Sequence, residues 1–260
     1  MTILRSRARE LDRTTSEMVH MDFGEPDFDT PVNIREKAKE KLDEGFTHYT
    51  PQTGIPELKE AIADYIKESR GFRPDEKQIL ITPGAKGIMF SSILAVVERG
   101  DEVLVSDPAY PPYLAILRYV GAKIVPFPLR GEDFSPSIEE INEKITQKTK
   151  MIIVNSPNNP CGSILKKDKV KGIARICEDG GLYLLSDEIY CRIIYEGEHY
   201  TPCMDGCEDR SVLLDGFSKA YAMTGWRLGF GVGPKEVIKR MGLIMGNAVT
   251  CVPAFTQWAG

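Results

Sequence analysis

The sequence predicts an α/β fold, a three-layer α/β/α sandwich built around a mostly parallel, seven-stranded sheet. Two observations support this prediction: short apolar, β-branched segments recur along the chain, and segments with helical spacing of apolar residues lie among them. Short strands that alternate with helices are typical of a parallel sheet covered on both faces. The expected strands are residues 78–82, 102–106, 123–125, 151–154, 182–185, 211–214 and 228–232.

Seven helices are expected, and the first two carry clear end signals. Thr30 and Pro31 are typical of an N-cap followed by proline at the first helical position, and Gly45 marks the end of that helix. The second helix has apolar residues at helical spacing and ends at Gly71. The expected helices are residues 33–44, 55–70, 86–98, 111–119, 137–145, 166–178 and 234–246.

The last strand and the end of the chain differ from this regular pattern. Residues 228–232 follow 211–214 after a connection that is short for a parallel crossover, so we expect this strand to be antiparallel. Beyond Pro234 the sequence is helical, and Phe255 and Trp258 form an aromatic face with no evident partner. We therefore expect the chain to be the N-terminal part of a longer protein.

Composition and charge exclude several classes of protein. The chain has 260 residues, with 33 Lys and Arg against 38 Asp and Glu, a net charge of −5 that disfavours nucleic acids and anionic membranes as partners. The longest nearly apolar segment, residues 88–97, is about half as long as the roughly 20 residues of a membrane span. The first ten residues contain no apolar signal core, so we expect a cytoplasmic protein whose six cysteines are thiols.

No metal site is expected. His199, Cys203 and Cys207 lie close in the sequence, but their spacing is not that of a zinc site and no second ligand pair follows, which favours ordinary loop cysteines. The three histidines are dispersed and no G-x-S-x-G segment is present, so a hydrolase triad is also disfavoured.

Several chemically capable residues follow the expected strands, and sheets of this kind bind ligands beyond the carboxyl ends of their strands. Gly84 precedes a helix whose first N–H groups can bind a phosphate, the alternative being an ordinary strand–helix turn. Tyr110 can stack on a flat ring, or it is a packed loop tyrosine. Asn159 can direct its amide at a ligand, or it is a turn asparagine.

The charged residues add further chemistry. Asp187 follows an apolar strand, where a carboxylate is costly to bury unless it meets a cation; the alternative is a helix cap. Tyr190 can hydrogen-bond the same ligand. Lys219 lies among small and apolar residues, which lower the pKa of a lysine and make it nucleophilic, whereas the alternative is a surface lysine. With Arg227 as a phosphate clamp, these features together describe one ligand, pyridoxal 5′-phosphate (PLP).

Five segments, in the same order, resemble the class I and II aminotransferases of PLP fold type I. They are residues 23–28 (FGEPDF), 48–58 (HYTPQTGIPEL), 155–162 (NSPNNPCG), 186–190 (SDEIY) and 218–227 (SKAYAMTGWR). The resemblance covers nearly the whole chain and is greatest for the bacterial and archaeal aspartate aminotransferase branch.

The resemblance implies the following roles. Lys219 would form the Schiff base with PLP and shuttle the proton, Asp187 would pair with the ring nitrogen, and Tyr190 would hydrogen-bond the phenolic oxygen. Tyr49 would reach the phosphate of the neighbouring subunit in a homodimer with shared sites. The other cofactor-binding residues would be Gly84, Ala85, Lys86, Tyr110, Asn159, Ser218 and Arg227. The substrate-binding residues would be Gly24, Lys86 and Asn159, and Lys86 favours an acidic substrate.

The expected activity is therefore PLP-dependent transfer of an amino group from an amino acid, with aspartate favoured, to a 2-oxo acid such as 2-oxoglutarate. Two alternatives remain open: a C–S β-lyase of the same fold, and a PLP-binding fragment without turnover. A PLP-sensing transcription regulator is disfavoured, because neither the first 30 residues nor the net charge supports a helix-turn-helix.

Three departures from the family pattern are visible. Gly216 stands where serine or threonine is frequent, Cys161 stands where threonine is usual, and members of the family are longer. The resemblance divides the chain into an N-terminal arm of the small domain, residues 1–30, and a large PLP-binding domain, residues 31–260. The C-terminal part of the small domain carries the arginine that binds the substrate α-carboxylate, and no residue here is assigned that role.

Overall fold

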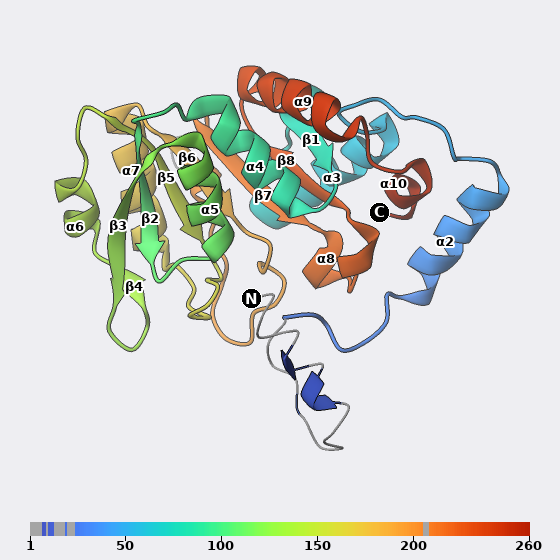
Figure 1. The fold of residues 1–260 in the computed structure, drawn as a ribbon, viewed down its shortest axis with the longest axis horizontal. Coiled ribbons are helices and arrows are strands. Elements are labelled where there is room, and N and C mark those ends of the chain that lie inside the picture. The colour runs from blue at the N-terminus through green and yellow to red at the C-terminus, as the bar shows by residue number, and fades with distance from the viewer. Residues whose placement is uncertain (1–6, 9, 13–18, 20–23, 205–207) are drawn as a thin grey trace.

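The computed structural model describes residues 7–8, 10–12, 19, 24–204 and 208–260, and these form an α/β sandwich (Figure 1). One sheet of eight strands has the order β1-β8-β7-β6-β5-β2-β3-β4. Most of the expected N-terminal arm, together with Phe23 and Cys207, lies outside the described residues. The strands are β1 (Ile79–Thr82), β2 (Glu102–Asp107), β3 (Lys123–Arg130), β4 (Ser135–Pro136), β5 (Thr149–Asn155), β6 (Tyr183–Asp187), β7 (Ser211–Gly216) and β8 (Gly229–Val232).

The predicted fold class is confirmed, and so is the direction of the last strand. β8 pairs antiparallel with both β1 and β7. The five adjacent strands in the middle of the sheet run parallel to one another: β7, β6, β5, β2 and β3. The sheet contains one strand more than the seven predicted, because the two-residue β4 turns back onto β3. This segment is too short and too polar to show a strand pattern in the sequence.

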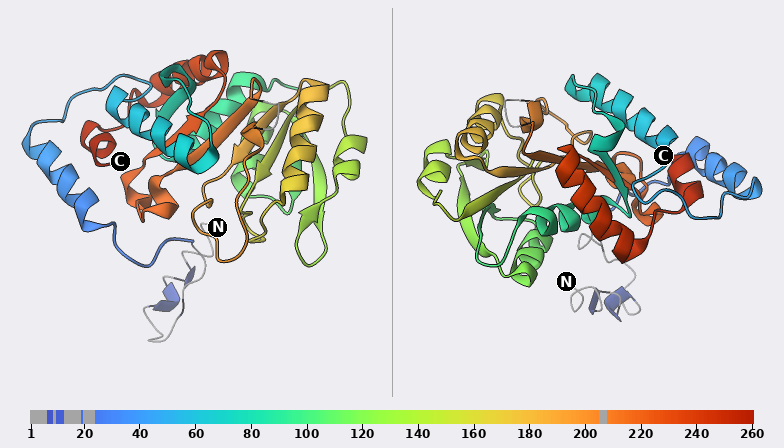
Figure 2. Two further views of the ribbon diagram at one scale, coloured as in Figure 1. Left: turned by 180° about the vertical axis from the view of Figure 1, so that it is seen from behind. Right: turned by 90° about the horizontal axis from the view of Figure 1, so that it is seen from above.

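Helices cover both faces of the sheet, as the view from above shows (Figure 2). The helices are α2 (Val32–Asp43), α3 (Pro56–Arg70), α4 (Ala85–Val96), α5 (Pro111–Val120), α6 (Ile138–Glu143), α7 (Lys167–Gly180), α8 (Phe217–Ala220), α9 (Lys235–Val249) and α10 (Ala254–Ala259). Side chains alternate along each strand: Val103 and Val105 pack with α4, α5 and α9, whereas Leu104 packs with α6 and α7 on the other face. α3 covers the second face beside β1 and β8. Among the described residues, no helix has the length and apolar character needed to cross a bilayer.

The predicted N-cap of the first helix is wrong. Pro31 is the residue that precedes α2, and the helix end has no side-chain cap. The hydroxyl of Thr30 instead donates a hydrogen bond of 2.5 Å to the carbonyl of Ala222 and accepts one of 2.9 Å from Trp226 Nε1. Thr30 therefore attaches the chain before α2 to the segment that follows α8.

The aromatic face at the end of the chain is not without a partner, contrary to the prediction. α10 packs against α2, and the Trp258 ring lies edge-on to Phe46 with centroids 5.3 Å apart. The ammonium of Lys41 lies 4.8 Å from the Trp258 ring centroid. These contacts join α10 to α2 and to the segment that directly follows it.

Candidate functional site

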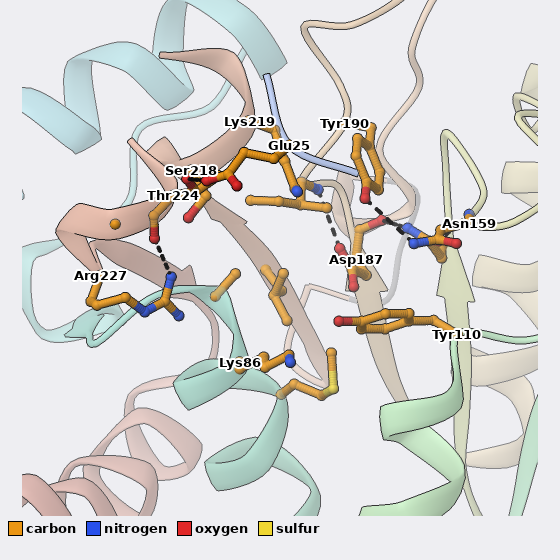
Figure 3. Close-up of a pocket in the computed structure, with 16 residues that line it drawn as sticks. Glu25, Lys86, Tyr110, Asn159, Asp187, Tyr190, Ser218, Lys219, Thr224 and Arg227 are labelled. Carbon is orange, nitrogen blue, oxygen red and sulfur yellow. Dashed lines mark hydrogen bonds between the residues drawn. The ribbon is translucent and has the colours of Figure 1, made fainter. Parts of the chain in front are cut away.

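A pocket of about 450 Å³ opens at the carboxyl ends of the central strands, between the sheet and the segment that follows α8 (Figure 3). The side chains that line it come from six separate segments of the chain. It brings together nine of the residues predicted to form the site: Ala85, Lys86, Tyr110, Asn159, Asp187, Tyr190, Ser218, Lys219 and Arg227.

Asp187 ends β6 with its carboxylate buried at the base of this pocket. It accepts a hydrogen bond of 2.5 Å from the hydroxyl of Tyr113 and one of 3.2 Å from the N–H of Ile189. Burial raises the pKa of Asp187 to about 6, against the opposing effect of these hydrogen bonds. Among the described residues, Asp187 pairs with no cation. A buried carboxylate of this kind fits a protonated ring nitrogen, which would supply the missing positive charge.

Lys219 lines the same pocket as Asp187 and lies on the short helix α8 that follows β7 (Figure 3). Its ammonium donates a hydrogen bond to the carbonyl of Gly24 and lies 6.0 Å from the Tyr190 ring centroid. Burial lowers the pKa of Lys219, and the negative charge of Glu25 opposes this effect. The pocket therefore makes the amine less basic and more nucleophilic than that of a free lysine.

The start of α4 forms an anion-binding corner of the pocket. The N–H groups of the first residues of a helix have no partner within the helix, so those of Ala85 and Lys86 are suited to bind a phosphate. Gly84 has a φ of 74°, and a Cβ there would lie 2.3 Å from Nη2 of Arg227. Arg227 thus lies directly beside this corner, held by hydrogen bonds to the carbonyls of Thr224 (2.7 Å) and Pro83 (3.4 Å).

A close approach of two backbones brings this corner to the sheet. A Cβ at Gly229 would lie 2.3 Å from the backbone nitrogen of Ala85, so only glycine allows β8 to pass so near α4. A Cβ at Gly216 would lie 3.0 Å from Cα of Gly229 and 3.3 Å from the carbonyl oxygen of Leu228. The glycine at position 216, where the family often has a hydroxyl residue, therefore suits a tightly packed position. Ser218 supplies a buried hydroxyl at the pocket two residues later.

Aromatic and amide groups form the remaining wall. Tyr110 directly precedes α5 and its half-buried ring lies at the pocket, with the Lys86 ammonium 6.0 Å from the ring centroid. The Asn159 amide donates a hydrogen bond of 3.4 Å to the Tyr190 hydroxyl. Asn159 is itself fixed, because its N–H donates a hydrogen bond of 2.7 Å to Oδ1 of Asn155. The wall therefore combines a flat ring with two groups able to bind a polar substituent.

Three predicted site residues lie outside the pocket lining: Gly84, Gly24 and Tyr49. Gly84 directly precedes the lining residue Ala85. Gly24 lies at a neighbouring cavity and contacts the site through its carbonyl, which accepts the hydrogen bond from Lys219. Tyr49 is 87% exposed in the segment between α2 and α3 and does not line the pocket.

The sequence analysis missed several residues of the site. Glu25 lines the pocket and accepts a hydrogen bond from the Thr224 hydroxyl, and Tyr113 is the donor to Asp187. Signals for both were present, because Glu25 directly follows Gly24 in a family segment and Tyr113 lies one helical turn after Tyr110. The other missed lining residues are Met89, Asn155, Ile189, Leu214, Thr224 and Gly225.

The histidine considered above as a metal ligand has another partner. Nε2 of His199 lies 2.7 Å from Oε2 of Glu188, while Cys203 is buried elsewhere in the core and Cys207 lies outside the described residues. Across the described residues, no three His, Cys, Asp or Glu side chains are arranged to hold a metal ion.

Known proteins of one family resemble this chain over nearly its whole length. The model of the family described as aminotransferase class I and II matches residues 16–260. The aspartate aminotransferase of Pyrococcus horikoshii is 45% identical over 264 residues, which cover 100% of this chain and 68% of that protein. The aspartate/prephenate aminotransferase of Thermus thermophilus is 39% identical and is covered over 66% of its length, against 98% of this chain.

Solved structures show the same similarity. The structure of Thermus thermophilus aspartate aminotransferase with maleate superposes with a TM-score of 0.96 at 38% identity, covering 99% of this chain and 68% of that one. An aromatic aminotransferase from Pyrococcus horikoshii superposes with a TM-score of 0.91 at 38% identity, covering 97% of this chain and 69% of that one. The present chain thus spans about two thirds of the length of these relatives.

Proposed function

Because the chain belongs to the class I and II aminotransferases, whose cofactor is PLP, we propose that it transfers the amino group of L-aspartate to 2-oxoglutarate in the pocket described above. The observation that carries the proposal is the buried carboxylate of Asp187, which has no cation among the described residues and lines one pocket together with the lysine of lowered pKa. These two groups suit the two ends of one cofactor.

When bound, PLP provides a conjugated ring that stabilises negative charge at the α-carbon of an amino acid. The carboxylate of Asp187 would hold a proton at the ring nitrogen, since Tyr113 and Ile189 keep its two oxygens in place. The amine of Lys219 would accept the proton from the substrate α-carbon and donate it to the C4′ carbon of the cofactor, which requires a pKa below that of a free lysine.

The anion-binding corner would hold the phosphate of the cofactor. The N–H groups of Ala85 and Lys86 and the guanidinium of Arg227 beside Gly84 would bind it. The hydroxyl of Ser218, which lines the same pocket, would add a further donor. On the wall, Tyr110 would stack on the ring. Tyr190 and Asn159, already hydrogen-bonded to each other, would bind its phenolic oxygen.

The preference for an acidic substrate rests on Lys86. Its ammonium lies at the pocket beside the Tyr110 ring, where it would attract the second carboxylate of aspartate. Gly24 and Asn159 would lie beside the α-carboxylate. The solved structure of the Thermus thermophilus enzyme is one with maleate, a dicarboxylate, which supports the same preference.

We further propose a homodimer in which Tyr49 reaches the phosphate corner of the partner's site. Tyr49 is 87% exposed and lies outside its own pocket, and such an exposed aromatic side chain is suited to an interface. The division of the chain at residue 30 and a cytoplasmic location are proposed with it. The five described cysteines are free thiols, as suits a reducing compartment.

The test is the visible absorbance spectrum of the purified chain with PLP, before and after L-aspartate. We expect a protein-bound band that aspartate converts to the pyridoxamine form and 2-oxoglutarate restores, and that is absent in Lys219→Ala. Release of ammonia and pyruvate without a 2-oxo acid would instead indicate a lyase. A band that no amino acid changes would indicate cofactor binding without turnover.

A further inference from the structure

Four ionisable side chains form a buried ion cluster beside the site, on the α3 side of the sheet. Arg70 ends α3, Glu188 follows β6, Asp215 lies near the end of β7, and His199 lies in the loop between these two strands. Their side chains are 2%, 0%, 4% and 11% exposed, respectively. The proposed function assigns no role to any of them.

Glu188 is the centre of the cluster, because four side chains hydrogen-bond its carboxylate. Ser186 and Thr201 donate to Oε1 at 2.9 and 2.6 Å, while His199 Nε2 and Arg70 Nε lie 2.7 and 3.2 Å from Oε2. Burial opposes ionisation of Glu188, but the hydrogen bond from His199 and the charge of Arg70 lower its pKa to about 2. Glu188 is therefore held as a fixed anion.

Arg70 connects this anion to Asp215. Its Nη2 donates a hydrogen bond of 2.8 Å to Oδ2 of Asp215, which also accepts one of 3.3 Å from the Tyr65 hydroxyl. The second oxygen of Asp215 accepts a hydrogen bond of 2.7 Å from the N–H of Gly216. One guanidinium thus joins the ends of two neighbouring strands.

These strand ends are the ones that carry the cofactor chemistry. Glu188 directly follows Asp187 in the chain, and its N–H donates a hydrogen bond of 2.8 Å to the carbonyl of Leu214. Asp215 and Gly216 lead directly into α8, which carries Lys219. Asp187 faces the pocket, on the side of the sheet covered by α4 and α5. The cluster lies on the side covered by α3, so its side chains do not line the pocket.

Stability alone explains such a cluster poorly. Buried ion pairs lose much of their attraction to the cost of removing charges from water, and apolar side chains of similar volume are often as stable. The hydrogen-bonded carboxylates and guanidinium of this cluster provide one fixed arrangement of the elements they join. Among the described residues, the buried Nδ1 of His199 is the one polar side-chain atom of the cluster without a hydrogen-bond partner. Here the joined elements are α3 and the ends of β6 and β7.

We propose that Arg70 and Glu188 are positioning residues for the cofactor: they fix the strand end that carries Asp187, so that its carboxylate meets the ring nitrogen. This inference rests on the proposed function, since it assumes that the ring nitrogen lies at Asp187. It predicts that damage to the cluster weakens PLP binding through Asp187 and not through the phosphate corner.

A double-mutant cycle on PLP affinity tests this, using the purified full chain and a titration of the apo form with PLP. We expect Glu188→Gln to raise the Kd of PLP at least about fivefold. In an Asp187→Asn background, the same Glu188→Gln change is expected to alter the Kd less than about twofold, because the residue through which it acts is already lost. A merely structural role would give the same factor in both backgrounds.

Glu102→Gln is the matched control. Glu102 is also a buried carboxylate, hydrogen-bonded by Lys123 and Thr146 at 2.8 and 2.7 Å. It is the first residue of β2 and so lies at the amino end of this strand, away from the pocket at the carboxyl ends. We expect it to lower the unfolding midpoint and leave the Kd of PLP unchanged. Should Glu188→Gln fail to fold, Thr201→Val removes one hydrogen bond to Glu188 without burying an unpaired charge and enters the same cycle.

Three outcomes overturn the inference: an unchanged Kd in the Glu188 variant, equal factors in both backgrounds, or an equal rise in Kd for Glu102→Gln. The failure of the proposed function is a separate result. In that case the starting chain itself would show no PLP binding that depends on Lys219, and the inference would fail with it.

Discussion

The hydroxyl of Tyr113 lies 2.5 Å from Oδ2 of Asp187, and both side chains are buried. This hydrogen bond joins the first turn of α5 to the end of β6, at the base of the pocket. It favours the ionised form of Asp187, whereas burial favours the neutral form. The charge of this carboxylate therefore depends on a residue that the family segments do not include.

Replacement of Tyr113 by phenylalanine removes that donor and little else. We expect Tyr113→Phe to lower the free energy of unfolding of the apo chain by about 1–3 kcal/mol at pH 8, where Asp187 is ionised. At pH 5 the loss should be smaller, because the carboxyl group is then mostly neutral. Chemical denaturation at both pH values measures the difference. Tyr119→Phe, at a 77% exposed position, serves as the control and should change little.

The raised pKa of Asp187 gives stability a defined pH dependence. The folded chain binds the proton up to about pH 6, whereas the unfolded chain loses it near pH 3.9, so folding is disfavoured as the pH rises between these values. Over this pH range, the free energy of unfolding falls by up to about 3 kcal/mol because of this group. In the apo form, Asp187→Asn should therefore gain stability over the starting chain between pH 4 and pH 7. A constant difference over that range would contradict the assignment.

Glu25 opposes the effect of burial on Lys219, since its negative charge raises the pKa of the amine. We expect Glu25→Gln to lower the pKa of Lys219 further. The measurement is the pH dependence of Lys219 modification by an amine-reactive reagent in the apo chain, followed by peptide mass analysis. The midpoint should move to lower pH in the variant. The pH profile of an exposed lysine in the same digest, Lys123, should not move.

The close approach of β8 to α4 predicts a severe effect of one methyl group. A Cβ at Gly229 would overlap the backbone of Gly84 and Ala85, neither of which can rotate away. Gly229→Ala should lower the free energy of unfolding by about 1–3 kcal/mol or more and weaken PLP binding at the phosphate corner. Gly225→Ala, where a Cβ would meet no atom within 4 Å, is the control for stability. Equal stability of the two variants would show that the corner can relax.

Lys86 should determine how strongly an acidic substrate is preferred. In Lys86→Met the side chain keeps much of its length but loses its charge. We expect the KM for L-aspartate to rise about tenfold or more, because a charge-assisted contact is lost, while the KM for L-alanine changes little. Steady-state kinetics with both donors gives the comparison. Parallel changes for both substrates would mean that Lys86 acts on the cofactor alone.

The sequence predicted the features that depend on neighbours in the chain. The short connection before residues 228–232 indicated an antiparallel strand, and Gly71 ends α3 with a φ of 82°. The catalytic candidates could be predicted to lie together because each lies at or after the end of an apolar strand, and parallel strands end at the same edge of the sheet.

The missed features depend on contacts between distant parts of the chain. The hydroxyl of Thr30 donates a hydrogen bond to the carbonyl of Ala222, which is 192 residues away. This tertiary contact replaces the local N-cap that the sequence predicted. Phe46 and Trp258 likewise lie in distant segments of the chain, so their contact could not be predicted from local sequence. The buried ion cluster carried no local signal, because Arg70 and Glu188 are 118 residues apart and only the folded sheet brings them together.

The position of β8 has a consequence for the order in which the molecule is built. β1, whose residues Ile79–Thr82 are all buried, pairs with β8 and no other described strand. During synthesis, β1 leaves the ribosome about 150 residues before its partner, and domains complete only once such distant pairings can close. Until then, β1 presents an apolar strand edge of the kind that templates aggregation. The phosphate corner, built between β1 and β8, is therefore among the last parts of the nascent protein to form.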